Sequence, residues 1–165
     1  RPTNGSSGDT NATFEYDGSS WTSVNAANLA ARTRQSFGIQ AAAAMVGGFQ
    51  QATATYTNAT EEYDGTNWTT VTAMPAATAS ANAIGTQTAA IVSLGGTPYN
   101  PSVVAETWDG TSWANSASIT TARYGAGVSD GNTNGIIAGG RTAPGFSTAV
   151  EEFTVVTTAR NITTS

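Results

Sequence analysis

The chain has 165 residues, a net charge of −5 and only 10% charged side chains, against about 25% in an average soluble domain. It contains no lysine, histidine or cysteine. This argues against nucleic-acid binding and leaves no residues for an imidazole or thiolate metal site, or for a Ser–His or Cys–His nucleophile. The longest apolar run, residues 41–46, is far shorter than the roughly 20 residues of a membrane span. We therefore expect no cofactor and no membrane-spanning segment.

The first segments of the chain are short and polar. Residues 1–11 are rich in Gly, Ser, Thr and Asn, a composition that predicts an N-terminal arm or linker. Residues 12–24 then hold one hairpin with no strands before it, so they form only part of a repeat unit.

Two complete units follow, and each is predicted to contain four strands separated by turn residues. Unit 34–72 has predicted strands at 35–40, 42–48, 57–64 and 68–72. Unit 79–117 has predicted strands at 80–85, 89–96, 103–109 and 113–117. The alanines at 41–44 favour helix by propensity, but they take the place of β-like residues in the later units. We therefore predict a strand there.

The last unit, residues 123–157, is incomplete. Three strands are predicted at 124–129, 135–140 and 149–156. The fourth strand is unclear because the Asp-Gly turn and the Trp of the other units are missing; the strand that begins at Trp21 could complete this unit. Residues 158–165 are predicted to form a C-terminal tail.

An aromatic residue, an Asp-Gly turn and a tryptophan recur in the units. Asp-Gly tolerates the positive φ of a tight hairpin turn, and the interval of about 46 residues between copies is typical of stacked repeat units. Because the aromatics stand at the same place in each unit, we predict that they pack between neighbouring sheets; a platform for sugars is the alternative. The recurring aromatics are Tyr16 and Trp21, Tyr63 and Trp68, Trp108 and Trp113, and Phe153.

A double glycine closes the second predicted strand of each of the last three units. Glycine weakens a strand, so its recurrence indicates a bend or a close backbone approach that a Cβ atom would prevent. A phosphate-cradling loop is disfavoured because neither a helix nor a lysine follows. The pairs are Gly47 and Gly48, Gly95 and Gly96, and Gly139 and Gly140.

The order of these features resembles the kelch repeat, which runs from an Arg-led inner strand to a Gly-Gly pair, an aromatic, a turn and a Trp. Arg34 and Arg123 occupy the Arg position in two units, whereas Ala79 replaces it in the unit between them. The resemblance covers about residues 12–157. It implies an all-β fold of kelch-like β-propeller blades, each a four-stranded antiparallel sheet, with about three to three and a half repeats. Such a piece would be part of a larger or oligomeric propeller, because propellers typically have at least four blades.

Two groups of residues are candidates for chemistry. Paired carboxylates could serve a glycosidase, but the glutamates recur at one place per unit, so we expect them on separate blades as charges that discourage wrong strand pairing. Residues 130–135 resemble the first half of an EF-hand calcium loop with Asp130, Asn132 and Asn134 as ligands, but Arg141 at the twelfth position favours a plain turn. The glutamates are Glu61, Glu62, Glu106, Glu151 and Glu152.

The amino-acid sequence of the repeat, with Glu-Tyr-Asp-Gly, also resembles that of kelch-like arrays in virion proteins of bacteriophages. We therefore expect a non-enzymatic structural or interaction module of a virion appendage or extracellular fibre. Its expected partners are other copies of itself or the rest of a longer chain, and other virion or fibre proteins. The alternative is a lectin-like binder of receptors or surface glycans, which would use loops 49–58, 97–104 and 141–148 and stacking on Tyr99. A carboxylate glycosidase is the least favoured hypothesis.

Overall fold

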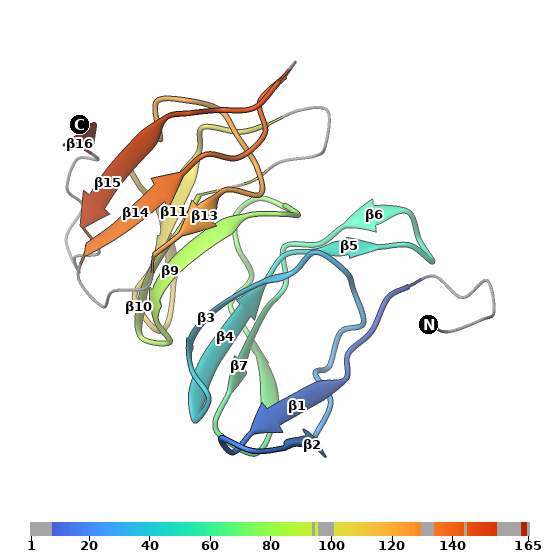
Figure 1. Ribbon diagram of the computed structural model, residues 1–165. Coiled ribbons are helices and arrows are strands. Elements are labelled where there is room, and N and C mark those ends of the chain that lie inside the picture. Colours follow the sequence, from blue (N-terminus) through green and yellow to red (C-terminus); the bar gives the residue numbers. More distant parts are fainter. Residues whose placement is uncertain are drawn as a thin grey trace.

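The computed structural model describes residues 8–93, 95, 101–129, 134–143, 145–154 and 163–164. Every regular element within these residues is a β-strand, and the strands form small antiparallel sheets that lie side by side (Figure 1). No helix among these residues is long and apolar enough to cross a membrane.

The N-terminal half contains a hairpin, one complete blade and a small satellite hairpin. The hairpin pairs β1 with β2, the blade has the strand order β3-β4-β7-β8, and β5 pairs with β6 beyond the blade (Figure 1). The strands are β1 (Thr13–Tyr16), β2 (Trp21–Val24), β3 (Gln35–Ile39), β4 (Ala42–Val46), β5 (Phe49–Gln50), β6 (Thr55–Tyr56), β7 (Thr60–Tyr63) and β8 (Trp68–Val71).

The C-terminal half contains two further blades of the same design. Their strand orders are β9-β10-β11-β12 and β13-β14-β15-β16, so each blade is a meander of four neighbouring strands. We number the three four-stranded blades one to three in chain order. The strands are β9 (Asn82–Thr86), β10 (Ala89–Ser93), β11 (Ala105–Trp108), β12 (Trp113–Asn115), β13 (Gly127–Val128), β14 (Asn134–Ala138), β15 (Val150–Thr154) and β16 (Thr163–Thr164).

The alanine-rich segment that favours helix by propensity is a strand. β4 pairs with β3 on one side and with β7 on the other. Ala44 is fully buried and belongs to the core between blades one and two. Tertiary pairing therefore outweighs local propensity here, because small side chains allow the neighbouring sheet to approach closely.

The last blade differs from its sequence-based description. Its outermost strand is β16, which pairs with β15 through Glu151 and Glu152. This strand lies within residues 158–165, which the sequence predicts to be a tail, and the strand at Trp21 is not borrowed. Trp21 instead pairs with Tyr16 inside the first hairpin.

Two apolar cores lie between the blades, and each is shared by two sheets. One contains Phe37 and Val46 of blade one together with Val92 and Trp108 of blade two. The other joins Ile84 of blade two to residues of blade three, among them Ile137 and Phe153. Because each sheet supplies only part of a core, the burial of its apolar residues depends on the neighbouring blade.

The aromatic pairs repeat one geometry in three hairpins. Ring centroids lie 5.1 Å apart for Tyr16 and Trp21, and 5.0 Å apart in the two later pairs, Tyr63 with Trp68 and Trp108 with Trp113. In each hairpin the turn aspartate accepts backbone N–H groups two and three residues later, and the following glycine has a positive φ. The loop therefore has a fixed shape that holds the two rings together.

In the two later aromatic pairs, the tryptophan also forms a hydrogen bond to the preceding sheet. The Trp68 Nε1–H donates to Thr13 Oγ1 of the hairpin at 2.9 Å, and Trp113 Nε1–H donates to Thr60 Oγ1 of blade one at 3.1 Å. Thr13 and Thr60 occupy the same place in their sheets, because each is the first residue of its strand, three positions before Tyr16 and Tyr63. Trp113 Nε1–H also lies 3.1 Å from the Thr72 carbonyl oxygen, so each tryptophan joins neighbouring blades by packing and by hydrogen bonding.

The glycine pairs allow close approach, but their register differs from the sequence alignment. A Cβ at Gly48, Gly95 or Gly140 would lie 3.1, 2.7 and 3.0 Å from the carbonyl oxygens of Arg32, Ala79 and Tyr124, respectively. The glycine of blade two that corresponds to Gly48 is therefore Gly95 rather than Gly96, which lies outside the described residues. The contact concerns backbone atoms that cannot rotate away, so a side chain is excluded.

Replacing Thr13 by valine would remove the acceptor of the Trp68 indole while keeping the side-chain shape. We expect the free energy of unfolding to fall by about 1 kcal/mol, because the indole N–H loses its partner. Urea unfolding followed by tryptophan fluorescence measures the change. The matched variant Thr22→Val, at an exposed position on β2, should unfold like the parent, and equal loss in both variants would contradict the role of this bond.

Candidate functional site

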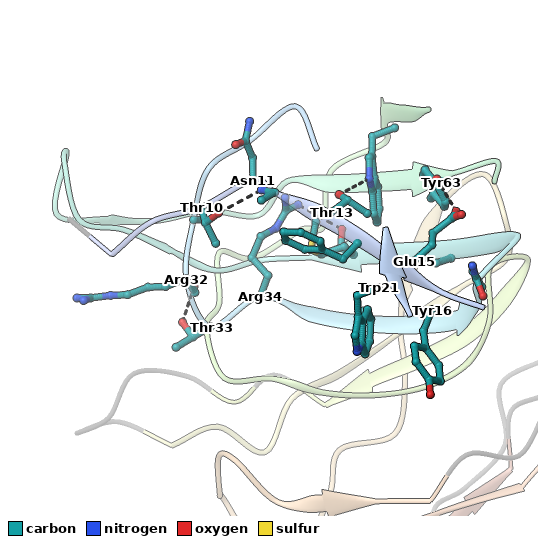
Figure 2. A pocket seen from close by; sticks show the side chains of 18 of the residues that line it. Thr10, Asn11, Thr13, Glu15, Tyr16, Trp21, Arg32, Thr33, Arg34 and Tyr63 are labelled. Atoms are coloured by element: carbon teal, nitrogen blue, oxygen red, sulfur yellow. Dashed lines mark hydrogen bonds between the residues drawn. The ribbon is translucent and has the colours of Figure 1, made fainter. Parts of the chain in front are cut away.

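A cavity of about 740 Å³ lies between the first hairpin and blade one. Its lining comes from β1, from the inner strands β3 and β4, and from the segment before β3 (Figure 2). The chain holds the hairpin over the outer half of the blade, because Glu15 accepts a hydrogen bond of 2.7 Å from Tyr63 Oη and Thr13 accepts one from Trp68. The Glu15 carboxylate also raises the pKa of Tyr63 to about 12. The inner half of the blade face is left open beside the hairpin.

The open face contrasts with the same face of blade two. In the register of the two inner hairpins, Ser36, Ala43 and Met45 correspond to Ala83, Ala90 and Val92. The three residues of blade two are buried in the core against blade one, whereas Ser36 is exposed and Ala43 and Met45 are half-buried. The sequence gives no signal for this difference, because it depends on which sheet precedes the blade.

The outer face of the hairpin is apolar and exposed. Tyr16 and Trp21 are 45% and 69% exposed, whereas Tyr63 and Trp108, which take the place of Tyr16 in blades one and two, are 3% and 2% exposed. Figure 2 shows Tyr16 and Trp21 on one side of β1, and Glu15 directed toward Tyr63 on the other. The aromatics thus pack between sheets, as predicted, only where a preceding sheet is present.

Three of the five glutamates are buried, so the expectation that they are strand-edge charges is wrong for these three. Glu61, Glu106 and Glu151 are fully buried, one in each blade. Glu61 forms an ion pair of 2.7 Å with Arg34 and accepts the backbone N–H groups of Asn28 and Leu29. A buried carboxylate is tolerated when a cation and hydrogen bonds satisfy its oxygens.

Blade three repeats this arrangement with an arginine from a different position. Arg123 pairs with Glu151, which also accepts the N–H groups of Thr120 and Thr121. Arg34 donates to the carbonyl of Gly47, and Arg123 donates to that of Gly139. By strand register, however, Arg34 corresponds to Ala81 of blade two and Ala126 of blade three. The sequence-based alignment of Arg34 with Ala79 and Arg123 is therefore wrong in register, although both arginines bind the buried glutamate of their own blade.

Blade two has the glutamate without the arginine. Glu106 is 1% exposed, and its Oε2 atom has no hydrogen-bond partner among the described residues. Burial raises the pKa of Glu106 to about 7, from an ordinary value of 4.5. The three glutamates lie on three separate sheets, and the oxygens of Glu61 and Glu151 are already bound by arginine and backbone groups.

The remaining candidates are only partly described. Tyr99, Asp130 and Asn132 lie outside the described residues, and Asn134 pairs with Thr154 at the start of β14. No group of three or more potential metal-ligating side chains occurs in the described part of the chain.

Two of the three predicted binding loops carry exposed rings. In loop 49–58, Phe49 contacts Tyr56 at 5.0 Å and lies under Arg32, whose guanidinium carbon is 4.9 Å from the ring centroid. In loop 141–148, Phe146 is 81% exposed and Arg141 lies 5.4 Å over its ring. The rings of Phe49 and Phe146 are therefore each held by a cation–π contact. Both lie on connections between the second and third strands of their blades.

These blades define the class of fold: consecutive kelch-like propeller blades, each a four-stranded antiparallel sheet packed face to face on the next. No family model matches the sequence, and no curated protein matches it by sequence. Among solved structures, the chain is similar to that of YjhT, a kelch-repeat propeller, with a TM-score of 0.72 and 15% identity. The match covers 87% of this chain and 48% of YjhT, so the chain spans about half the length of that propeller. A likeness at this identity shows the fold alone.

The unpaired Glu106 makes stability depend on pH. Its pKa is higher in the folded than in the unfolded protein, so its contribution is present below about pH 4.5 and is lost as pH rises to about 7. We expect the free energy of unfolding to fall by about 2 kcal/mol between pH 5 and pH 8 from this group, and Glu106→Gln to remove that fall. Urea unfolding at both pH values measures it.

The control is Glu152→Gln, which changes an exposed carboxylate on β15. This variant should keep the pH dependence of the parent. A Glu106→Gln variant with the same loss between pH 5 and pH 8 would show that Glu106 is not the titrating group.

Proposed function

We propose that this chain is a non-enzymatic structural and interaction module of a virion appendage or extracellular fibre. In this proposal it forms part of a propeller larger than itself, completed by other copies or by the rest of a longer chain. The observation that carries the proposal is the apolar end of the array at the first hairpin, where Phe14, Tyr16 and Trp21 are exposed. The location in a virion is part of the proposal and is based only on the resemblance of the repeat sequence to kelch-like arrays in virion proteins.

The opposite end of the array supports the same function. Ile136 and Val150 are exposed on the face of blade three that points away from blade two. Every inner face between blades one, two and three is covered by a neighbouring sheet. Exposed apolar faces at both ends of a stack are typical of surfaces that meet further protein.

The buried glutamates support a non-enzymatic role. A glycosidase needs two carboxyl groups at about 5 to 9.5 Å in one accessible pocket. Here the buried carboxylates are on separate blades, and two of them are neutralised by arginine. Their arrangement serves the packing of each blade rather than a shared reaction centre.

Self-association of the isolated chain tests this proposal. We expect sedimentation velocity to detect concentration-dependent species heavier than the 16.7 kDa chain, and Trp21→Gln to weaken their formation about tenfold because the end face loses its largest apolar side chain. Tyr56→Gln, on the satellite hairpin away from the end face, is the matched control and should associate like the parent. A monodisperse monomer at high concentration would contradict the need for covered ends.

A second candidate function is a lectin-like module that binds receptors or surface glycans. The exposed rings of Tyr56 and Phe146, each on a loop of the same kind, favour it, because aromatic faces stack on sugars. We expect Phe146→Ala to lower the signal of any glycan that the chain binds on an array by about tenfold. Phe14→Ala, which changes an exposed ring on the hairpin, is the control, and an array without enrichment would remove this candidate.

A further inference from the structure

The hairpin of β1 and β2 is half a blade, and β1 has a free edge. The strands that correspond to β1 are β7, β11 and β15, and each pairs on both sides. Within the part of the chain that the structure describes, β1 pairs only with β2. Its other edge faces the cavity over the open half of blade one (Figure 2). Unpaired backbone groups at such an edge are a template for another strand.

From this geometry we infer that the free edge of β1 and the adjoining cavity accept an antiparallel β-hairpin of small, uncharged side chains, which completes the half-blade. This inference rests on the proposed function, because it names the partner chemistry at one of the two open ends. The mode of binding is strand addition: backbone hydrogen bonds along β1, with side chains packed on blade one.

The face under the cavity has the composition of a site for such a hairpin. The corresponding face of blade two packs Ala83, Ala90 and Val92 against blade one, with no room for larger groups at Ala90, which is fully buried. Blade one presents Ser36, Ala43 and Met45 at these places. A partner with small side chains can therefore approach blade one as blade one approaches blade two.

Gln40 provides a specific contact for the added strand. Its counterpart Gln87 donates from Nε2 to the carbonyls of Ala43 and Tyr63, which lie on the second and third strands of blade one, at 3.0 and 2.8 Å. Gln40 lines the cavity and is exposed. By the same register we expect the Gln40 amide to donate to the carbonyl of Tyr16 and to one carbonyl of the added strand.

The charge of the partner is fixed by Phe14. Phe14 stands where the other blades have Glu61, Glu106 and Glu151. A hairpin with an arginine at the place of Arg34 would bring a cation without its carboxylate, at a high cost in desolvation. The partner is therefore uncharged at the position that corresponds to Arg34, where blade two has Ala81.

The chain itself supplies a probe of this chemistry. Residues 81–93, the inner hairpin of blade two, contain only small or uncharged side chains. A copy of this segment placed directly before Arg1 is connected to β1 by residues 1–12, a length close to the connections between β4 and β7 and between β10 and β11. In this fusion we expect the amides of β1 to exchange about tenfold more slowly and the urea midpoint to rise.

Two pairs of variants test the docking site in the fusion. Ser36→Trp fills the cavity face from a position that is exposed in the unfused chain, so it should abolish the added protection; Ser23→Trp, also exposed on β2, should retain it. Gln40→Ala should reduce the protection by about the loss of one or two hydrogen bonds. Gln50→Ala on β5 should not.

The outcomes separate this inference from the proposed function. Unchanged exchange of β1 in the fusion overturns the inference, whatever the assembly state. If β1 is instead protected in the unfused chain as concentration rises, a second copy occupies the edge, which overturns the hairpin and supports assembly. Protection in the fusion, together with an unfused chain that never associates, supports the hairpin and contradicts assembly through other copies.

Discussion

Each blade of this protein is a small sheet with apolar residues on both faces. A face is buried only when another sheet lies against it. The cores between blades one and two and between blades two and three each take residues from both sheets. Stability in such a stack is therefore shared between neighbours, and it is weakest at an end. Trp21 is exposed because no sheet of the described residues lies against it, whereas Trp68 and Trp113 each donate a hydrogen bond to the preceding sheet.

Buried ion pairs stabilise the first and the third blade from within. A glutamate on the third strand accepts two backbone N–H groups and one arginine in blades one and three. The arginine also binds the glycine carbonyl at the end of the second strand, so it joins three segments of one blade. In blade two the arginine is absent and burial raises the pKa of Glu106. The middle blade, covered on both faces, thus carries a buried carboxyl group without an arginine, and the Oε2 atom of this group has no hydrogen-bond partner among the described residues.

A short ladder of backbone hydrogen bonds connects the blades where their inner strands begin. Ser80 N–H donates to Thr33 C=O at 3.1 Å, and Gly125 N–H donates to Ser80 C=O at 3.2 Å. All three residues have a positive φ between 52° and 58°, which is a strained conformation for Thr33 and Ser80. Gly95 lies against the same segment, because a Cβ at this position would come within 2.0 Å of the Ser80 carbonyl oxygen.

The sequence was most informative where a local rule determines structure. Asp-Gly predicts the hairpin turns, because turn chemistry acts over a few residues. The repeated order of strands predicts β4 despite its alanines, because later units have β-like residues at the same place. Register was harder to predict. Gly95 rather than Gly96 corresponds to Gly48, and Arg123 reaches its glutamate from another position than Arg34, because long side chains and one-residue shifts leave the order of motifs unchanged.

By itself, then, the sequence determined the kind of unit, the number of its strands and the aromatic rings that join one unit to the next. It determined these because turns, strand pairing and side-chain alternation are local properties of the chain. Only the tertiary structure decided which glutamates are buried, which tryptophan lacks a neighbour and which strand edge is free. These properties depend on the sheet that lies opposite a residue, and that sheet comes from a segment about 45 residues away, or from outside the array.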